Sequence, residues 1–200
     1  MRIVVINHLT LDGVMQAPGR ADEDTRDGFV HGGWAASELE SPDPAIASAM
    51  GGRMAASGGL LLGRRTYDDL LASWNQRGGP FKDALNNAPK HVATRATEPL
   101  GWPNSTRIGP DVASDVAAMK ARPGGDLHVL GSGQLVAALM QHHLVDEFVL
   151  IIHPIVLGSG HRLFAAGSTP TTLQLAGAEP TSSGAVIATY RTKQPSQNPS

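Results

Sequence analysis

The feature that most constrains this chain is the alternation of short apolar runs with longer segments of helical periodicity. Residues 3–6, 60–62 and 148–152 are apolar at every position, and residues 127–130 are interrupted by one histidine. Runs that are apolar on both faces are typical of strands in parallel sheets, because helices cover both sides of such sheets. The pattern therefore predicts an α/β protein built on a largely parallel sheet.

The segments between these runs carry apolar residues at helical spacing. Tyr67, Leu70, Leu71 and Trp74 follow the i, i+3, i+4, i+7 pattern of an amphipathic helix. Other helices are predicted over residues 43–54, 111–120 and 133–140, and other strands over residues 90–94, 172–176 and 185–191. The last two strands lie close together in the sequence, which predicts an antiparallel edge to the sheet.

The chain of 200 residues shows no internal repeat and no shift in composition that would mark a domain boundary. We therefore expect one domain over residues 1–192. Residues 193–200 are polar and contain two prolines, which predicts a flexible C-terminal tail.

Composition excludes several classes of function. The net charge of −2 argues against nucleic acid as a partner, since such proteins carry a basic excess. Cysteine is absent and the eight histidines form no i, i+4 pair, so we expect no metal site. No stretch approaches the roughly 20 apolar residues of a membrane span. A cytoplasmic protein that does not contact a membrane is the expectation.

A long segment without periodicity runs from about residue 12 to residue 42 and contains a charged cluster between Asp22 and Asp27. A loop of this length inside a compact domain is either a lid or binding loop, or a solvated insertion. The pattern alone leaves both interpretations open.

Two predicted strands run through glycine directly into a helix, at Gly63 and at Gly131-Ser132-Gly133. A helix N-terminus presents free N–H groups that attract anions, and glycine lets a ligand approach the backbone. Two such junctions in one sheet could hold the two phosphates of a dinucleotide, although each alone could be ordinary turn geometry. Arg64, Arg65 and Thr66 add phosphate-binding groups at the first junction, and Arg95 follows a strand where a ribose 2′-phosphate could bind.

Several other catalytic motifs are incomplete. The segment from Gly131 to Val136 lacks the third glycine of a Rossmann fingerprint. The chain contains no Walker loop, and neither Ser132 nor Ser159 stands in a G-x-S-x-G nucleophile elbow.

Five motifs in one order carry a family resemblance. They are Thr10-Leu11-Asp12-Gly13, Leu62-Gly63-Arg64-Arg65-Thr66-Tyr67, Leu130-Gly131-Ser132-Gly133-Gln134-Leu135, Leu144-Val145-Asp146-Glu147 and Pro154-Ile155-Val156-Leu157-Gly158-Ser159-Gly160. The sequence resembles the dihydrofolate-reductase-like superfamily, in the branch of the reductase domain of bifunctional riboflavin-pathway deaminase–reductases. The zinc-binding deaminase half of those enzymes has no counterpart here.

The resemblance implies a three-layer α/β/α sandwich with a mixed, mostly parallel sheet, NADPH as hydride donor and a homodimer. It implies reduction of a C=N or C=O bond in a small pyrimidine- or pterin-like molecule, as by 5-amino-6-(5-phosphoribosylamino)uracil reductase. The residues implied to bind the cofactor are Gly63, Arg64, Arg65, Thr66, Thr94, Arg95, Gly131, Ser132, Gly133, Gln134 and Leu135. Those expected to bind the substrate are Thr10, Gly13, Met15, Asp27 and Trp34.

Asp12 is the candidate catalytic residue, because the resemblance places it facing the substrate. It could relay a proton if a pocket walled by Met15 and Trp34 raised its pKa by desolvation. It could equally cap the turn after the first strand.

The substrate also remains open at this stage. Arg20 and Arg26 would suit a ribose phosphate, whereas Asp27 or Glu38 would supply the carboxylate that a dihydrofolate-type pterin reductase needs. A non-catalytic dimer that binds a nucleotide is the alternative from another functional class.

Overall fold

An eight-stranded sheet forms the centre of the computed structural model, which describes residues 1–193. The predicted flexible tail therefore lies, from residue 194 onward, outside the described residues. The strands are β1 (Ile3–Thr10), β2 (Ser57–Gly63), β3 (Lys90–Ala93), β4 (Ser105–Ile108), β5 (Asp126–Leu130), β6 (Glu147–His153), β7 (Leu173–Pro180) and β8 (Val186–Thr192). Their order is β4-β3-β2-β5-β1-β6-β8-β7.

The sheet is mixed and mostly parallel. Strands β1 to β6 pair in parallel, whereas β8 is antiparallel to both β6 and β7. The predicted parallel sheet with an antiparallel edge is confirmed.

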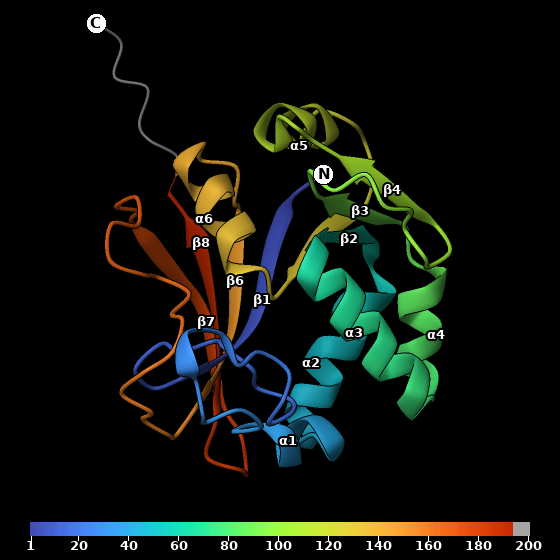
Figure 1. Ribbon diagram of the computed structural model, residues 1–200. Helices are drawn as coiled ribbons and strands as arrows, with labels where there is room; N and C mark the ends of the chain where they lie inside the picture. The colour runs from blue at the N-terminus through green and yellow to red at the C-terminus, as the bar shows by residue number, and fades with distance from the viewer. Residues whose placement is uncertain (194–200) are drawn as a thin grey trace, which may run out of the picture.

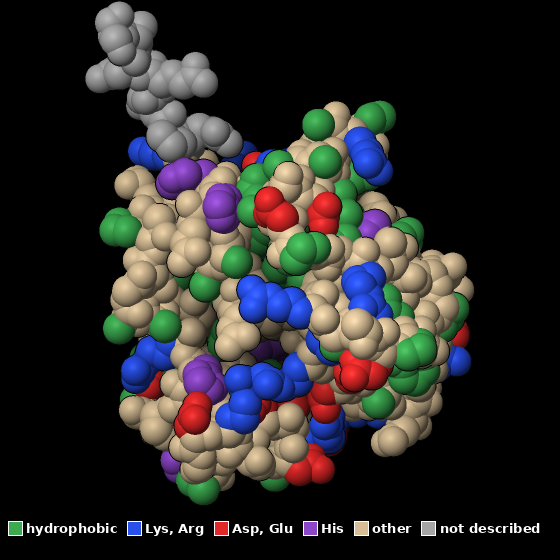
Figure 2. All heavy atoms as spheres, turned by 45° about the horizontal axis from the view of Figure 1, so that its top comes forward, with side chains coloured by type: hydrophobic (Ala, Val, Ile, Leu, Met, Phe, Trp, Pro, Cys, Tyr) green, Lys and Arg blue, Asp and Glu red, His purple; other side chains and the backbone are tan. Residues whose placement is uncertain are grey.

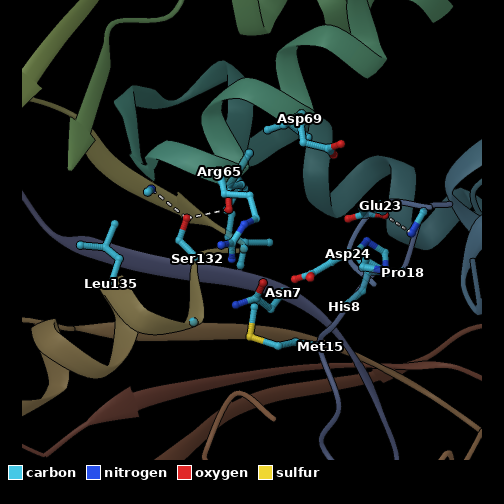
Figure 3. Close-up of a pocket in the computed structure, with 18 of the residues that line it drawn as sticks. Asn7, His8, Met15, Pro18, Glu23, Asp24, Arg65, Asp69, Ser132 and Leu135 are labelled. Carbon is cyan, nitrogen blue, oxygen red and sulfur yellow. Dashed lines mark hydrogen bonds between the residues drawn. The ribbon is translucent and has the colours of Figure 1, made fainter. Parts of the chain in front are cut away.

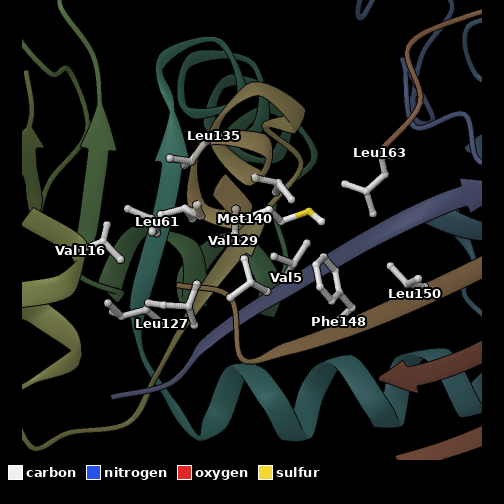
Figure 4. Close-up of a cluster of buried hydrophobic side chains, with 14 of the residues drawn as sticks. Val5, Leu61, Val116, Leu127, Val129, Leu135, Met140, Phe148, Leu150 and Leu163 are labelled. Atoms are coloured by element: carbon white, nitrogen blue, oxygen red, sulfur yellow. The ribbon is translucent and has the colours of Figure 1, made fainter. Parts of the chain in front are cut away.

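Helices cover both faces of this sheet (Figure 1). They are α1 (Ala36–Glu40), α2 (Pro44–Ala55), α3 (Arg64–Arg77), α4 (Pro80–Asn87), α5 (Val112–Lys120) and α6 (Gly133–Gln141), with a 3-10 turn at Arg26–Gly28. Helices α5 and α6 pack on one face, where Ile3 and Val5 of β1 point (Figure 4). Helices α2, α3 and α4 pack on the other, against Val4 and Ile6. The three-layer α/β/α arrangement is therefore confirmed.

Outside the long segment after β1, two elements were not predicted from the sequence. Strand β4 has exposed side chains at Thr106 and Arg107, so its sequence lacks the apolar pattern of a buried strand. Helix α4 is eight residues long with a single buried residue, Leu85. The long segment after β1 is also more ordered than predicted, since it contains the 3-10 turn and α1.

The strand order creates a crevice at one edge of the sheet. Strands β2 and β5 are neighbours, but the helices that follow them, α3 and α6, pack on opposite faces. Ligands of open α/β sheets bind at such a switch point, outside the carboxyl ends of the strands. Strand β1 also extends beyond β5, because their pairing stops at Ile6 and Leu130 while β1 continues to Thr10. Among the described helices, none is long and apolar enough to cross a membrane.

A buried lysine side chain caps the C-terminal end of helix α4. Lys90 is wholly buried, and its Nζ donates to the carbonyls of Leu85 (2.6 Å), Asn86 (3.0 Å) and Ala88 (2.8 Å). Burial lowers the pKa of Lys90. The side chain satisfies carbonyl groups that the helix end would otherwise leave without donors.

We predict that Lys90→Met lowers the free energy of unfolding by about 2–4 kcal/mol, because several carbonyl oxygens lose their donor in a buried place. Urea denaturation measures this change. Lys82→Met is the matched control, since Lys82 lies on the same helix in a surface pair with Asp83, and its loss should cost about 0.5 kcal/mol or less. Equal stability of the two variants would contradict this role of Lys90.

Candidate functional site

A cavity of about 1380 Å³ opens at the carboxyl edge of the parallel strands. It is lined by residues that follow β2, β3 and β5, by the end of β1, and by the segment from Met15 to Arg26. Figure 2 shows Lys and Arg side chains around a hollow in this surface. Figure 3 shows Asn7 and Met15 inside it, between Ser132 on one side and Asp24 and His8 on the other.

Ser132 joins the two strand–helix junctions. Its Oγ accepts a hydrogen bond from the Gly63 amide (2.8 Å) and donates one to Oγ1 of Thr66 (2.8 Å). The two chains approach so closely that a Cβ on Gly131 would lie 3.1 Å from Cγ2 of Thr66. Gly131 also has a φ of 59°, which favours glycine. The prediction that the two junctions share one cleft is confirmed.

Two helix starts at the cavity, those of α3 and α6, lack side-chain caps. By contrast, helices α2 and α5 begin after Asp43 and Asp111, whose carboxylates accept backbone N–H groups. Helices α3 and α6 begin after Gly63 and Ser132, and neither residue makes a side-chain cap bond. Their first N–H groups are thus available to an anion, and the helix dipole favours negative charge there.

The arginines that line the cavity differ in their partners. Arg64 pairs with Asp68 and Arg20 with Asp69, at 2.7 and 2.5 Å, and Arg26 pairs with Asp24. Arg65 and Arg95 are exposed and form no salt bridge within residues 1–193. Two unpaired guanidinium groups beside two uncapped helix starts give this part of the cavity the donors and the positive charge that suit an anion, and we call it the anion-binding region for that reason.

The eleven residues predicted to bind the cofactor all line the cavity. They are Gly63, Arg64, Arg65, Thr66, Thr94, Arg95, Gly131, Ser132, Gly133, Gln134 and Leu135. Met15 lines the cavity as well. The remaining residues predicted to bind the substrate, which are Thr10, Gly13, Asp27 and Trp34, are absent from its lining.

Of the two roles left open for Asp12, the structure supports the cap of the turn after β1 and contradicts the proton relay with a raised pKa. Its carboxylate accepts hydrogen bonds from the Thr10 hydroxyl (2.6 Å) and from the amides of Leu157 (3.2 Å) and Gly158 (2.9 Å). Arg162 lies 3.3 Å away. These donors, Thr10 first, hold the pKa of Asp12 well below its ordinary value. Asp12 does not line the cavity, and it fastens the turn after β1 to the segment after β6.

Two further expectations for the substrate are corrected. Asp27 is 80% exposed and pairs with His161 at 2.9 Å, on the surface beside the cavity. Trp34 donates its indole N–H to the Gln16 carbonyl (2.7 Å) and packs edge-on against His153. Arg20, Arg26 and Glu38 do line the cavity.

Sequence reasoning missed two residues of β1 and two carboxylates in the cavity. Asn7 and His8 line it where β1 extends beyond β5, and Glu23 and Asp24 line it from the long loop. Asn7 is 5% exposed, and its Nδ2 is sealed from solvent without a hydrogen-bond partner in the described part of the chain. A signal existed, because two polar residues directly follow the apolar run at residues 3–6. Within residues 1–193, no group of three or more His, Asp or Glu residues could hold a metal ion.

The fold and the cavity together define an α/β protein with an anion-binding region at the switch point of its sheet. The family model described as the RibD C-terminal domain matches residues 2–187. The chain therefore belongs to the RibD C-terminal domain family, which confirms the riboflavin-reductase branch of the resemblance.

Relatives and solved structures agree with this membership. The chain is 35% identical to the uncharacterized protein YyaP of Bacillus subtilis (strain 168) over 140 residues, which is 66% of this chain and 72% of YyaP. A crystal structure from Shewanella sp. PV-4, named for riboflavin biosynthesis, superposes with a TM-score of 0.70 at 22% identity, covering 97% of this chain and 100% of that one. The deaminase/5-amino-6-(5-phosphoribosylamino)uracil reductase of Thermotoga maritima superposes with a TM-score of 0.61 at 15% identity. That match covers 96% of this chain but 56% of the longer enzyme. At these identities the structures show a common fold.

We predict that Asp12→Asn lowers the melting temperature at neutral pH, and that the difference from the wild type shrinks as the pH falls below about 4. A carboxylate whose pKa is depressed in the folded state stabilises the fold above its unfolded pKa, and this contribution is lost on acidification. Thermal melts across this pH range measure the effect. Asp22→Asn is the control because Asp22 is 85% exposed, and a constant Asp12→Asn difference at all pH values would contradict the prediction.

Proposed function

We propose that this protein is an NADPH-dependent reductase that transfers a hydride to a C=N or C=O bond of a pyrimidine- or pterin-like substrate. The observation that carries the proposal is the anion-binding region, in which two uncapped helix starts and two unpaired arginines surround one cavity. Membership of the RibD C-terminal domain family supports reductase chemistry.

The residues present fit the charges of NADPH. Its pyrophosphate would lie at the starts of α3 and α6, which Ser132 holds side by side. Arg65 and Arg95 would bind the 2′-phosphate with planar forks of N–H donors. A cavity of about 1380 Å³ exceeds the roughly 300–1000 Å³ of a pocket for one small ligand, which leaves room for a substrate beside the cofactor.

NADPH supplies a hydride when it is bound, and the protein must orient the substrate and deliver a proton. Met15 lies next to the start of α6, since its Sδ would be 3.0 Å from a Cβ on Gly133. The substrate would lie beyond it, among Asn7, His8 and Asp24.

A pyrimidine carrying a ribose phosphate is the substrate class we favour. Arg20 and Arg26 line the cavity and could bind a phosphate, although both already pair with carboxylates.

The same wall of the cavity supports a second candidate function, that of a dihydrofolate-type pterin reductase. Asp24 provides a carboxylate in the cavity, and its bond from Arg26 lowers the pKa of Asp24 so that it stays ionised. Turnover with the two substrates separates these candidates. Saturable NADPH binding without turnover of either would favour the non-catalytic dimer.

We predict that Arg65→Ala and Arg95→Ala each weaken NADPH binding roughly tenfold while NADH binding changes little, because each removes a charged partner of the 2′-phosphate. Quenching of the fluorescence of the three tryptophans measures both dissociation constants. Arg122→Ala is the matched control, since Arg122 is exposed and absent from the cavity lining. Equal loss of NADPH and NADH affinity would overturn the 2′-phosphate assignment.

We also propose that the protein is a homodimer, as the family resemblance implies. Strand β7 ends the sheet and is exposed along nearly its whole length, including Leu175 at 54%. A long exposed edge strand is prone to pairing with another chain. A second copy that covers β7 would bury both this edge and Leu175.

We predict that the wild type elutes as a dimer in size-exclusion chromatography with light scattering, and that Leu175→Lys shifts it toward the monomer by placing a charge in the interface. Val30→Lys is the control, because Val30 is an exposed apolar residue of the long segment after β1. A monomeric wild type would refute the assembly.

A further inference from the structure

Two histidines on neighbouring strands form a hydrogen-bonded pair beside the cavity. Nδ1 of His8 lies 2.9 Å from Nε2 of His153, and the ring centroids are 5.2 Å apart. His153 is opposite Thr10 in the pairing of β6 with β1. His8 is therefore its diagonal neighbour on the same face of the sheet, within reach of a long side chain.

The pair connects the cavity with the protein interior. His8 lines the cavity on the part of β1 that extends beyond β5, and it is partly exposed there. His153 is 7% exposed behind it, with the Trp34 ring packed edge-on at 5.4 Å. Because Nδ1 of His8 contacts His153, Nε2 is the ring nitrogen left for a ligand, and no described residue bonds it.

Both rings are neutral near pH 7. Burial lowers the pKa of His8 to about 3, and the adjacent His153 contributes to that shift. Burial also lowers the pKa of His153, while the nearby charge of Glu38 acts in the opposite direction. Two neutral rings in contact share one N–H between them. The tautomer of each ring thus depends on that of the other, and a proton that moves along the pair changes both.

The proposed reduction needs a proton donor that the carboxylates do not readily supply. Asp12 lies outside the cavity in a set of hydrogen bonds that keeps it ionised. Asp24 is kept ionised by Arg26. Glu23 is the competing donor, because burial raises its pKa, but its Oε2 already accepts the amides of Gly19 and Arg20.

We propose that His8 is the catalytic proton donor of this reductase and that His153 is the positioning residue that supplies His8 with a proton. The inference rests on the proposed function. As hydride adds to the carbon of the C=N or C=O bond, the π electron pair moves to the heteroatom, which takes the proton from Nε2 of His8. Nδ1 of His8 then takes the proton from Nε2 of His153. Nδ1 of His153 takes one from water, and the hydroxide that is left is neutralised by a proton from bulk solvent. Both rings end neutral, the substrate is reduced, NADPH is oxidised to NADP⁺, and one proton of the solvent is consumed.

The test measures single-turnover oxidation of NADPH with 5-amino-6-(5-phosphoribosylamino)uracil as the probe, in wild type and variants. His8→Ala should lower the rate constant about 100-fold or more, the usual contribution of general acid catalysis, while the NADPH dissociation constant stays unchanged. Added imidazole should restore part of the rate in this variant, because it can occupy the space that the ring left. A merely structural histidine would show no such rescue. His153→Gln can still hydrogen-bond His8 but cannot pass a proton between two ring nitrogens, so its rate should fall as well.

The matched control is His128→Ala, which removes another buried strand histidine that is absent from the cavity lining. Its rate should stay near that of the wild type and should not respond to imidazole. A His8→Ala rate near the wild type, or a large loss confined to Glu23→Gln, would overturn the histidine path and leave the reductase intact. A wild type that binds NADPH but does not oxidise it with the probe or with dihydrofolate would instead overturn the proposed function, and the histidine path with it.

Discussion

The contact on which the candidate site depends is the pair of hydrogen bonds that Ser132 makes with Gly63 and Thr66. Strands β2 and β5 are neighbours, yet their helices diverge to opposite faces of the sheet. A diverging pair leaves a crevice, and a single hydroxyl group sets how wide the crevice is at its base. Ser132 bonds across the crevice instead of capping its own helix α6, and α3 has no side-chain cap because its N-cap residue is Gly63.

The end of β1 forms the other wall, because β1 continues after its partner β5 has stopped. Side chains on the two faces of a strand normally point into separate layers. Here Asn7 and His8 point to opposite faces and still line one cavity, since beyond Ile6 no strand among residues 1–193 pairs with that edge of β1. The buried, unpartnered Nδ2 of Asn7 fits a ligand-binding edge better than a structural one, because buried polar groups are otherwise hydrogen-bonded.

The fold and the anion-binding region were predictable because both depend on local chemistry. Apolar runs, helical spacing and glycine at strand–helix junctions are properties of neighbouring residues, and they indicated the two junctions at which Arg65 and Ser132 line the cavity. The role of Asp12 was not predictable in this way. Its partners Leu157, Gly158 and Arg162 lie about 145–150 residues away in the sequence, so whether its pKa rises or falls depends on a tertiary contact. Asp27 failed for a related reason, since a turn in the long segment directs it to His161 on the surface.

The long segment after β1 forms a fixed wall of the cavity through bonds at several points. Gln16 donates to the carbonyls of Asp24 and Arg26 and accepts the amide of His161, and Arg20 reaches Asp69 on α3. These contacts tie it to itself, to the segment after β6 and to the helix that begins at the anion-binding region. Carboxylates pair with Arg20 and Arg26 in this wall. Elsewhere in the cavity, Arg77 stacks on Trp74 and Arg162 bonds Asp12. Arg65 and Arg95 are therefore the cavity arginines with neither an acidic nor an aromatic partner among residues 1–193. The free positive charge is thus concentrated at Arg65 and Arg95, whereas Arg20 and Arg26 would have to exchange their carboxylate partners for the phosphate of the substrate class proposed above.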